Sequence, residues 1–112
     1  MKKNFFLIAA LLLAAVIYYG CDKKDDTPEP ELPTPPAADF TFIVSNHQTR
    51  TVDFTNTSVY ANSYSWNFGD AVTSTVTSPQ HSFPSYGSYS VALTAHGQGG
   101  SNTATKTVTI TP

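Results

Sequence analysis

The sequence predicts an all-β fold in which about seven short strands pack as a two-sheet sandwich. In successive segments, large apolar residues alternate with small or polar ones, which is the period of a strand that buries one face. These segments recur about every 8 to 12 residues, with turn-forming residues between them. No helical period is present after the first twenty residues. The three observations together favour a sandwich over a helical or mixed fold.

The first two strands are expected over 40–44 (FTFIV) and 51–55 (TVDFT). Both alternate between apolar and other residues, and the turn-forming residues 45–48 (SNHQ) and 56–58 (NTS) end them. The third strand is expected over 64–68 (YSWNF), which carries the only tryptophan of the chain. Burying this side chain removes roughly 150 to 250 Å² from water, so neighbouring strands have to be arranged around it.

The remaining elements follow at similar spacing. Residues 72–77 predict a short polar edge strand, because the next proline, Pro79, cannot donate a backbone hydrogen bond. Tyr89 lies near the start of the penultimate strand, where a tyrosine corner is expected. The other elements are a lead-in over 79–83, a corner over 84–87, a strand ending at His96, a turn over 97–100 and a last strand over 103–111. The expected core consists of Phe42, Phe54, Trp66, Tyr89, Val91, Leu93 and Val108.

Three motifs occur in a fixed order: Trp66–Asp70 (WNFGD), Pro79–Phe83 (PQHSF) and Gly87–Thr94 (GSYSVALT). Their succession resembles the polycystic kidney disease (PKD) domain, whose pattern is W-D-F-G-D-G, P-x-H-x-Y and G-x-Y-x-V-x-L-T. The resemblance implies an immunoglobulin-like β-sandwich over residues 37–112. The matched positions carry structural roles in that family, and they are Trp66, Phe68, Gly69, Asp70, Pro79, His81, Gly87 and Tyr89.

The sequence departs from the family pattern at two positions of the first motif. Asn67 stands where the family has aspartate, and Ala71 stands where it has glycine. We therefore expect a looser turn after Asp70 and no cation site built on paired aspartates there. For His81, the resemblance implies a structural histidine that hydrogen-bonds the backbone.

The first 20 residues have the features of a lipoprotein signal peptide. Lys2 and Lys3 precede an uncharged, mostly apolar run over 5–19, which at about 1.5 Å per residue is too short to cross a core of about 30 Å as a helix. Gly20 and Cys21 then resemble a bacterial lipobox, in which the cysteine sulfur receives diacylglycerol. The alternative is an ordinary secreted or membrane-anchored protein with a free cysteine. We expect lipidation at Cys21, the only cysteine of the chain.

Residues 21–36 are expected to form an acidic and proline-rich linker. The segment 22–26 (DKKDD) resembles the export signal that follows the cysteine in surface lipoproteins of the Bacteroidetes, although a short charged run can also be a plain solvated spacer. Residues 27–36 contain five of the eight prolines and favour polyproline II. At about 3.1 Å per residue, the linker could hold the domain up to roughly 50 Å from a membrane. These features predict an outer-membrane protein that is lipid-anchored and surface-exposed.

Charge and composition exclude several function classes. Without the leader, four basic residues face eight carboxylates, so the net charge is −4 and nucleic-acid binding is disfavoured. His47, His81 and His96 lack the close spacing of zinc ligands, and we expect no metal and no cofactor. No serine lies in a G-x-S-x-G motif, and a domain of this size has little room for a closed active site. The sequence therefore predicts a protein that is not an enzyme.

Tyr60 and Tyr86 are the candidate ligand-binding residues, because neither fits an inward strand register. An exposed tyrosine can stack on a sugar ring or anchor a protein contact. The first hypothesis is a non-catalytic binding or adhesion module for polysaccharide or another envelope protein. The alternatives are a structural spacer without a ligand, and an accessory subunit of a surface glycan-degrading complex.

Overall fold

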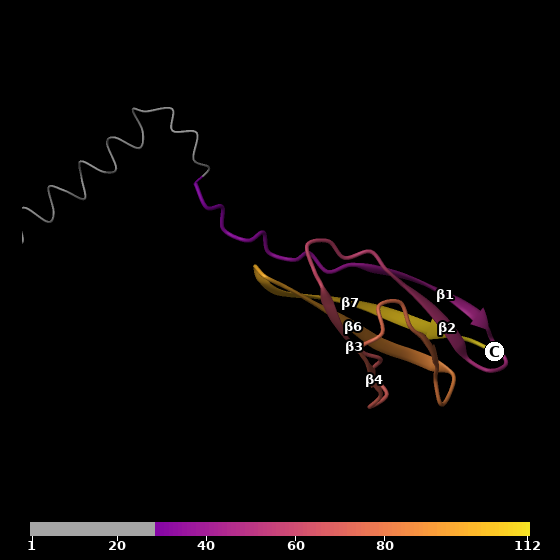
Figure 1. Cartoon of the computed structure of the whole chain (residues 1–112). Coiled ribbons are helices and arrows are strands. Elements are labelled where there is room, and N and C mark those ends of the chain that lie inside the picture. Colours follow the sequence, from indigo (N-terminus) through magenta and orange to yellow (C-terminus); the bar gives the residue numbers. More distant parts are fainter. Residues whose placement is uncertain (1–28) are drawn as a thin grey trace, which may run out of the picture. The chain divides into compact units, whose positions relative to one another are not determined.

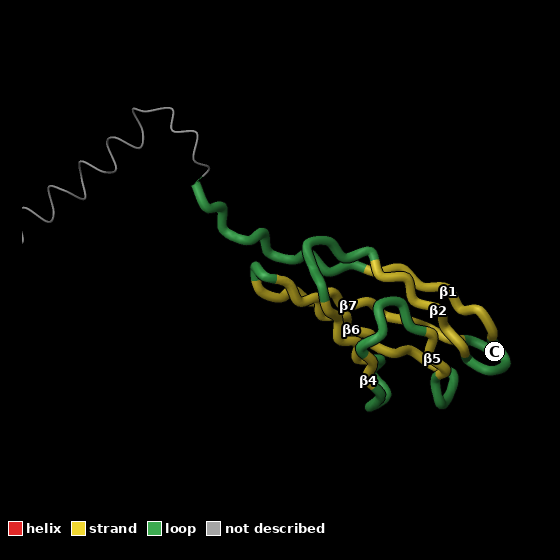
Figure 2. The backbone as a smooth tube through the Cα atoms, in the orientation of Figure 1, coloured by secondary structure: helices red, strands yellow, loops and turns green. Residues whose placement is uncertain are grey.

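A computed structural model describes residues 29–112 and has a compact unit over Leu32–Pro112. Seven strands form two antiparallel sheets in this unit, and the described residues contain no helix (Figures 1 and 2). The predicted all-β sandwich is confirmed. The leader, Cys21 and linker residues 22–28 lie outside the described residues.

The first sheet has the strand order β1-β2-β5, formed by Phe40–Asn46, Thr51–Asn56 and Gln80–Ser82. β1 and β2 form a hairpin in which Phe42 lies opposite Phe54 on the inner face. β5 pairs with the other edge of β2, and the chain reaches it through Pro79, whose carbonyl accepts the N–H of Phe54 at 2.9 Å.

The second sheet has the order β4-β3-β6-β7, formed by Thr73–Ser74, Ser63–Asn67, Gly87–Gly97 and Gly100–Ile110. β6 and β7 pair along their whole length, from Gly87 opposite Ile110 to Gly97 opposite Gly100. Only two residues, Gln98 and Gly99, connect the two strands. β7 therefore begins at Gly100, three residues before Thr103, where the sequence predicts the start of the last strand. Figure 1 shows this long hairpin as one layer and β1 with β2 as the other.

The core fills the space between the sheets and is centred on Trp66. Its indole contacts Phe40 edge-on at 5.0 Å and Phe54 at 5.3 Å between ring centroids. The indole N–H donates to the carbonyl of Val76 at 2.9 Å, so the buried ring has a partner for its only polar atom. The fully enclosed cluster consists of Phe40, Val52, Phe54, Trp66, Phe68, Phe83, Val91, Leu93, Val108 and Ile110.

Two members of the expected core lie at its margin. Phe42 and Tyr89 are only partly buried and pack against the cluster from outside, whereas Phe40 is fully buried. Phe40 and Phe42 share one face of β1, but Phe40 is the one in contact with Trp66. Phe42 lies further along an edge strand, where it is covered by Phe54 of the neighbouring strand.

The last residues of the proline-rich segment belong to the compact unit. Pro36 is buried, and Ala37 exchanges two backbone hydrogen bonds of 3.0 Å with Val59. Gly99 lies so close to the peptide between Thr34 and Pro35 that a Cβ atom on it would be 2.4 Å from the Thr34 carbonyl oxygen. The segment is thus attached to the end of the sandwich that holds the β6–β7 turn.

Candidate functional site

The turn after β3 is held by Asp70 and His81. The Oδ2 atom of Asp70 lies 2.7 Å from Nε2 of His81, and both side chains are largely buried. The imidazole stacks on Phe68, with centroids 4.1 Å apart, and meets Phe83 edge-on at 4.6 Å. The expected partner of His81 was the backbone, and this was wrong, because the enclosed Asp70 carboxylate is within direct reach. The pair connects the WNFGD and PQHSF motifs and engages Nε2 of the imidazole.

The turn after Asp70 is closed by backbone and side-chain hydrogen bonds. The N–H of Phe68 donates to the Val72 carbonyl at 3.1 Å, and the N–H of Val72 donates to Oδ1 of Asp70 at 3.2 Å. Asn67 accepts the N–H of Gly69 through its amide oxygen, as a carboxylate would. Ala71 adopts a φ of 70°, the left-handed conformation that suits glycine. The turn is therefore closed, and alanine occupies a glycine position in it.

The corner before β6 is tied by Tyr89. Its hydroxyl donates to the carbonyl of Ser85 at 2.9 Å, four residues upstream, which is the hydrogen bond expected of a tyrosine corner. The ring stacks on Phe83 at 4.4 Å, and Gly87 begins the strand with a φ of 140°. These contacts fix the corner, in which Ser85 and Gly87 remain exposed.

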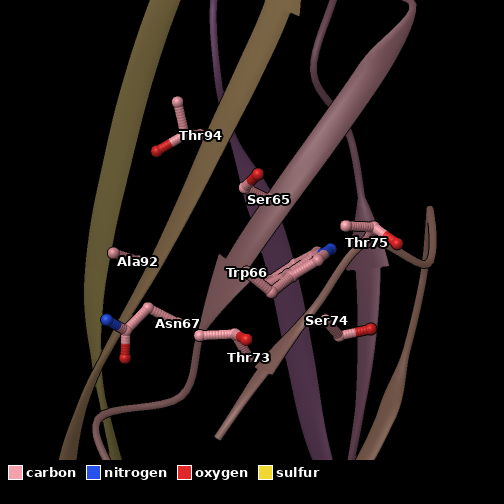
Figure 3. A pocket seen from close by; sticks show the side chains of 8 residues that line it. All are labelled: Ser65, Trp66, Asn67, Thr73, Ser74, Thr75, Ala92 and Thr94. Atoms are coloured by element: carbon pink, nitrogen blue, oxygen red, sulfur yellow. The ribbon is translucent and has the colours of Figure 1, made fainter. Parts of the chain in front are cut away.

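A shallow groove of about 630 Å³ lies on the outer face of the second sheet. Figure 3 shows Trp66 pointing toward the other sheet, whereas Asn67 and Ala92 point away from it into the groove. Hydroxyl groups on this face bond to one another across strands, as Thr94 does with Thr103 at 2.9 Å. The groove offers neither an exposed aromatic ring nor a charged side chain. Its lining residues are Ser65, Trp66, Asn67, Thr73, Ser74, Thr75, Ala92 and Thr94.

Tyr60 lies in the loop between β2 and β3 and is the more exposed of the two candidate tyrosines, at 66%. Its backbone has a φ of 58°, which is rare for a bulky residue. The Tyr60 carbonyl packs on Gly97, where an added Cβ atom would be only 2.3 Å from the oxygen. A cleft of about 320 Å³ opens beside it, lined by Pro33, Thr34, Tyr60, Ala61, Asn62, Gly97 and Gln98.

Tyr86 lies at the other end of the sandwich, immediately before β6, and is 43% exposed. The guanidinium carbon of Arg50 lies over its ring, 5.5 Å from the centroid. Arg50 also donates from Nε to the Phe83 carbonyl at 2.9 Å. Because β6 separates Tyr86 from the Tyr60 end along its eleven residues, the structure does not bring the two tyrosines into one site.

The described part of the chain contains no group of three His, Cys, Asp or Glu side chains that could hold a metal ion. His47 bonds the Thr111 carbonyl through Nδ1 at 2.9 Å, and His81 is engaged by Asp70. Residues 29–112 also include no helix that is long and apolar enough to span a bilayer.

The sequence profile of the PKD domain matches residues 32–112, which includes every element of the sandwich. The chain belongs to the PKD domain family. Its matched region begins at Leu32, where the compact unit also begins. No curated protein matches the chain significantly.

Two bacterial domains are similar to this PKD domain in structure and sequence. The PKD1 domain of the Vibrio cholerae metalloprotease PrtV is 36% identical, with a TM-score of 0.62, and the match covers 70% of this chain and all of that one. The PKD1 domain of Vibrio anguillarum Epp is 29% identical with the same TM-score, over 70% of this chain and 95% of that one. The PKD domain of the human receptor SorCS2, at 19% identity and a TM-score of 0.55 over 79% of this chain and 85% of that one, shares the fold. PKD domains are generally non-catalytic modules, often found in surface or secreted proteins.

Sequence reasoning missed three features around the candidate tyrosines. Asn62 and Gln98 share the cleft with Tyr60, and Arg50 covers the ring of Tyr86. Asn62 is two residues from Tyr60, so its place in the same loop was a signal by which the sequence could have identified it as a candidate site residue. Gln98 has no such signal, because only the pairing of β3 with β6 brings the β6–β7 turn to this loop.

Proposed function

We propose that this protein is a membrane-tethered PKD-domain lipoprotein that binds polysaccharide at the cell surface without catalysis. The leader that ends at Gly20 and Cys21 supports the tether, and the proline-rich segment after it supports a spacer function. The observation that carries the binding role is Tyr60, an aromatic side chain left 66% exposed on a strained backbone. Strained conformations persist where the surrounding structure holds them, and they cluster at functional sites.

The affinity of a single domain is expected to be low. The two exposed tyrosines lie at different ends, and stacking is worth roughly 0.5 to 1.5 kcal/mol beyond burial. Many tethered copies acting on one repetitive polymer would raise the overall avidity without any new contact. A lipid-anchored module on an extended proline-rich spacer suits this mode of attachment.

Retention of the mature protein on immobilised polysaccharides tests the proposal. We expect wild type to be retained on at least one polysaccharide, and the Tyr60→Ala, Tyr86→Ala double variant to be retained less at an unchanged melting temperature. Ile43→Ala is the matched control, because it removes an equally exposed apolar side chain from the outer face of β1. Equal retention of wild type and double variant would exclude the tyrosines. If wild type is not retained on any polysaccharide, the spacer function is favoured instead.

A further inference from the structure

We infer that the cleft at the Tyr60 end is a subsite for an uncharged sugar ring, with Tyr60 as the stacking surface and Asn62 and Gln98 as hydrogen-bonding groups. The inference rests on the proposed polysaccharide binding and names the class of sugar and the residues that contact it. It places this subsite at the Tyr60 end of the sandwich.

The chemistry of the cleft selects a neutral ligand. Its side chains include an aromatic ring, a proline ring and two carboxamides, but no carboxylate, lysine, arginine or histidine. A carboxamide donates through nitrogen and accepts through oxygen, which matches sugar hydroxyl groups that do both. A charged sugar would lose water in this cleft and meet no opposite charge in return.

The two carboxamides are available to a ligand. Asn62 and Gln98 are both exposed, and neither side chain hydrogen-bonds to another group of the described chain. By comparison, Asn67 and Asn102 use their amide oxygens to accept backbone N–H groups. Both carboxamides of the cleft are therefore free to bind a ligand.

The loop that carries Tyr60 is fixed on both sides. Before it, Val59 exchanges two hydrogen bonds of 3.0 Å with Ala37, and after it the N–H of Asn62 donates to the His96 carbonyl at 2.8 Å. Gly97 leaves the space that the Tyr60 carbonyl fills. These contacts hold the left-handed conformation of Tyr60 before any ligand arrives, so little ordering entropy remains to be lost on binding.

The volume and walls of the cleft also suit a small ring. At about 320 Å³ it lies at the small end of the range for ligand pockets. Pro33 and Thr34 form one wall, so the end of the proline-rich segment takes part in the subsite. At the other end, the Arg50 guanidinium already covers the Tyr86 ring.

The test compares uncharged polysaccharides, dextran and mannan, with the carboxylated polymers alginate and polygalacturonate, using the mature protein on beads. Tyr60→Asn removes the ring but keeps a residue that tolerates positive φ, and Tyr60→Phe keeps the ring. We expect retention on an uncharged polymer, a loss of about 2- to 10-fold per site for Tyr60→Asn, and retention close to wild type for Tyr60→Phe. Asn62→Ala combined with Gln98→Ala is expected to weaken binding similarly.

Ile43→Ala, which removes an equally exposed apolar side chain from the outer face of β1, serves as the matched control and is expected to bind like wild type. Melting temperatures of all variants show whether a loss reflects unfolding. Retention only on alginate or polygalacturonate, or full retention of Tyr60→Asn, would overturn the subsite while leaving polysaccharide binding in place. Absence of wild-type retention on all four polymers would overturn the subsite together with the proposed function.

Discussion

At the scale of single residues, Trp66 organises the packing of the core and the path of the chain after β3. It is 1% exposed, contacts rings from both β1 and β2, and donates its N–H to the Val76 carbonyl. The hydrogen bond to Val76 fixes the segment after β4 next to the indole. The WNFGD motif thus acts in structure rather than in ligand binding, and exposed aromatic residues elsewhere have to supply any recognition.

Ala71 provides a prediction at this scale. An L-residue other than glycine is strained at a φ of 70°, so Ala71→Gly relieves the strain, although glycine also gains freedom in the unfolded chain. We expect the variant to be more stable by about 1 kcal/mol, or roughly 4 to 8 °C in melting temperature for a domain of this size. Thermal unfolding followed by tryptophan fluorescence measures the change.

Ala61→Gly is the control for this substitution. Ala61 is also a loop residue, but it does not have a positive φ, so glycine there is expected to lower stability. A loss of stability for Ala71→Gly as large as the loss for Ala61→Gly would show that the conformation of Ala71 carries no strain.

At the scale of elements, the alternation of apolar residues located most of the strands but not their ends, and β5 forms where only a lead-in over 79–83 was predicted. Residues 72–77 predict a strand, yet only Thr73 and Ser74 pair with β3. Ser74 accepts the N–H of Val76 through its side chain, and the Val76 carbonyl is used by Trp66. Local hydrogen bonds between side chains and the backbone compete with the backbone hydrogen bonds of a sheet. The alternation of apolar residues in the sequence does not predict such local bonds.

The edge strand β7 carries an inward-facing charge that ties the sheets together. Lys106 lies opposite Val91, reaches across to the Phe40 carbonyl and forms an ion pair of 2.9 Å with Asp39. An inward charge on an edge strand also disfavours pairing with other molecules. The hydrogen bond from Lys106 lowers the pKa of Asp39 below its usual range, with smaller contributions from the Phe40 N–H and from the Lys106 charge.

This ion pair gives a pH dependence with a definite sign. Because the pKa of Asp39 is lower in the folded chain, the unfolded chain binds more protons at acidic pH, and the contribution to stability is present above about pH 4 and lost below it. Lys106→Met keeps the aliphatic stem but removes the ammonium. We expect a smaller loss of stability between pH 6 and pH 2 in the variant, measured by urea unfolding. The same loss in both proteins would show that the pair does not contribute.

At the scale of the whole molecule, the sequence predicts the exposure of the candidate tyrosines but not the cleft beside Tyr60. Period-two patterning excluded Tyr60 and Tyr86 from the interior, and both are exposed. The cleft beside Tyr60 depends on contacts between segments far apart in sequence: the proline-rich end at Thr34, the loop at Asn62 and the turn at Gln98. Those contacts follow from strand register and from the close approach at Gly99, which a sequence pattern does not contain.

The proposed tether is also a property of the whole molecule, and Cys21 is the residue on which it would depend. If diacylglycerol is attached to the Cys21 sulfur, each buried methylene adds roughly 0.8 kcal/mol to membrane binding, and several acyl chains together hold the protein almost permanently. Cys21→Ser is expected to retain the leader and to lose labelling by a fatty-acid probe. Its polypeptide is therefore expected to be heavier than the mature wild-type polypeptide by the mass of residues 1–20. Cys21→Ser combined with an unrelated secretion leader provides a soluble control with the same domain, whose melting temperature is expected to equal that of the tethered protein. Undiminished fatty-acid labelling of Cys21→Ser would contradict the anchor, because no other cysteine is present in the chain to accept the lipid.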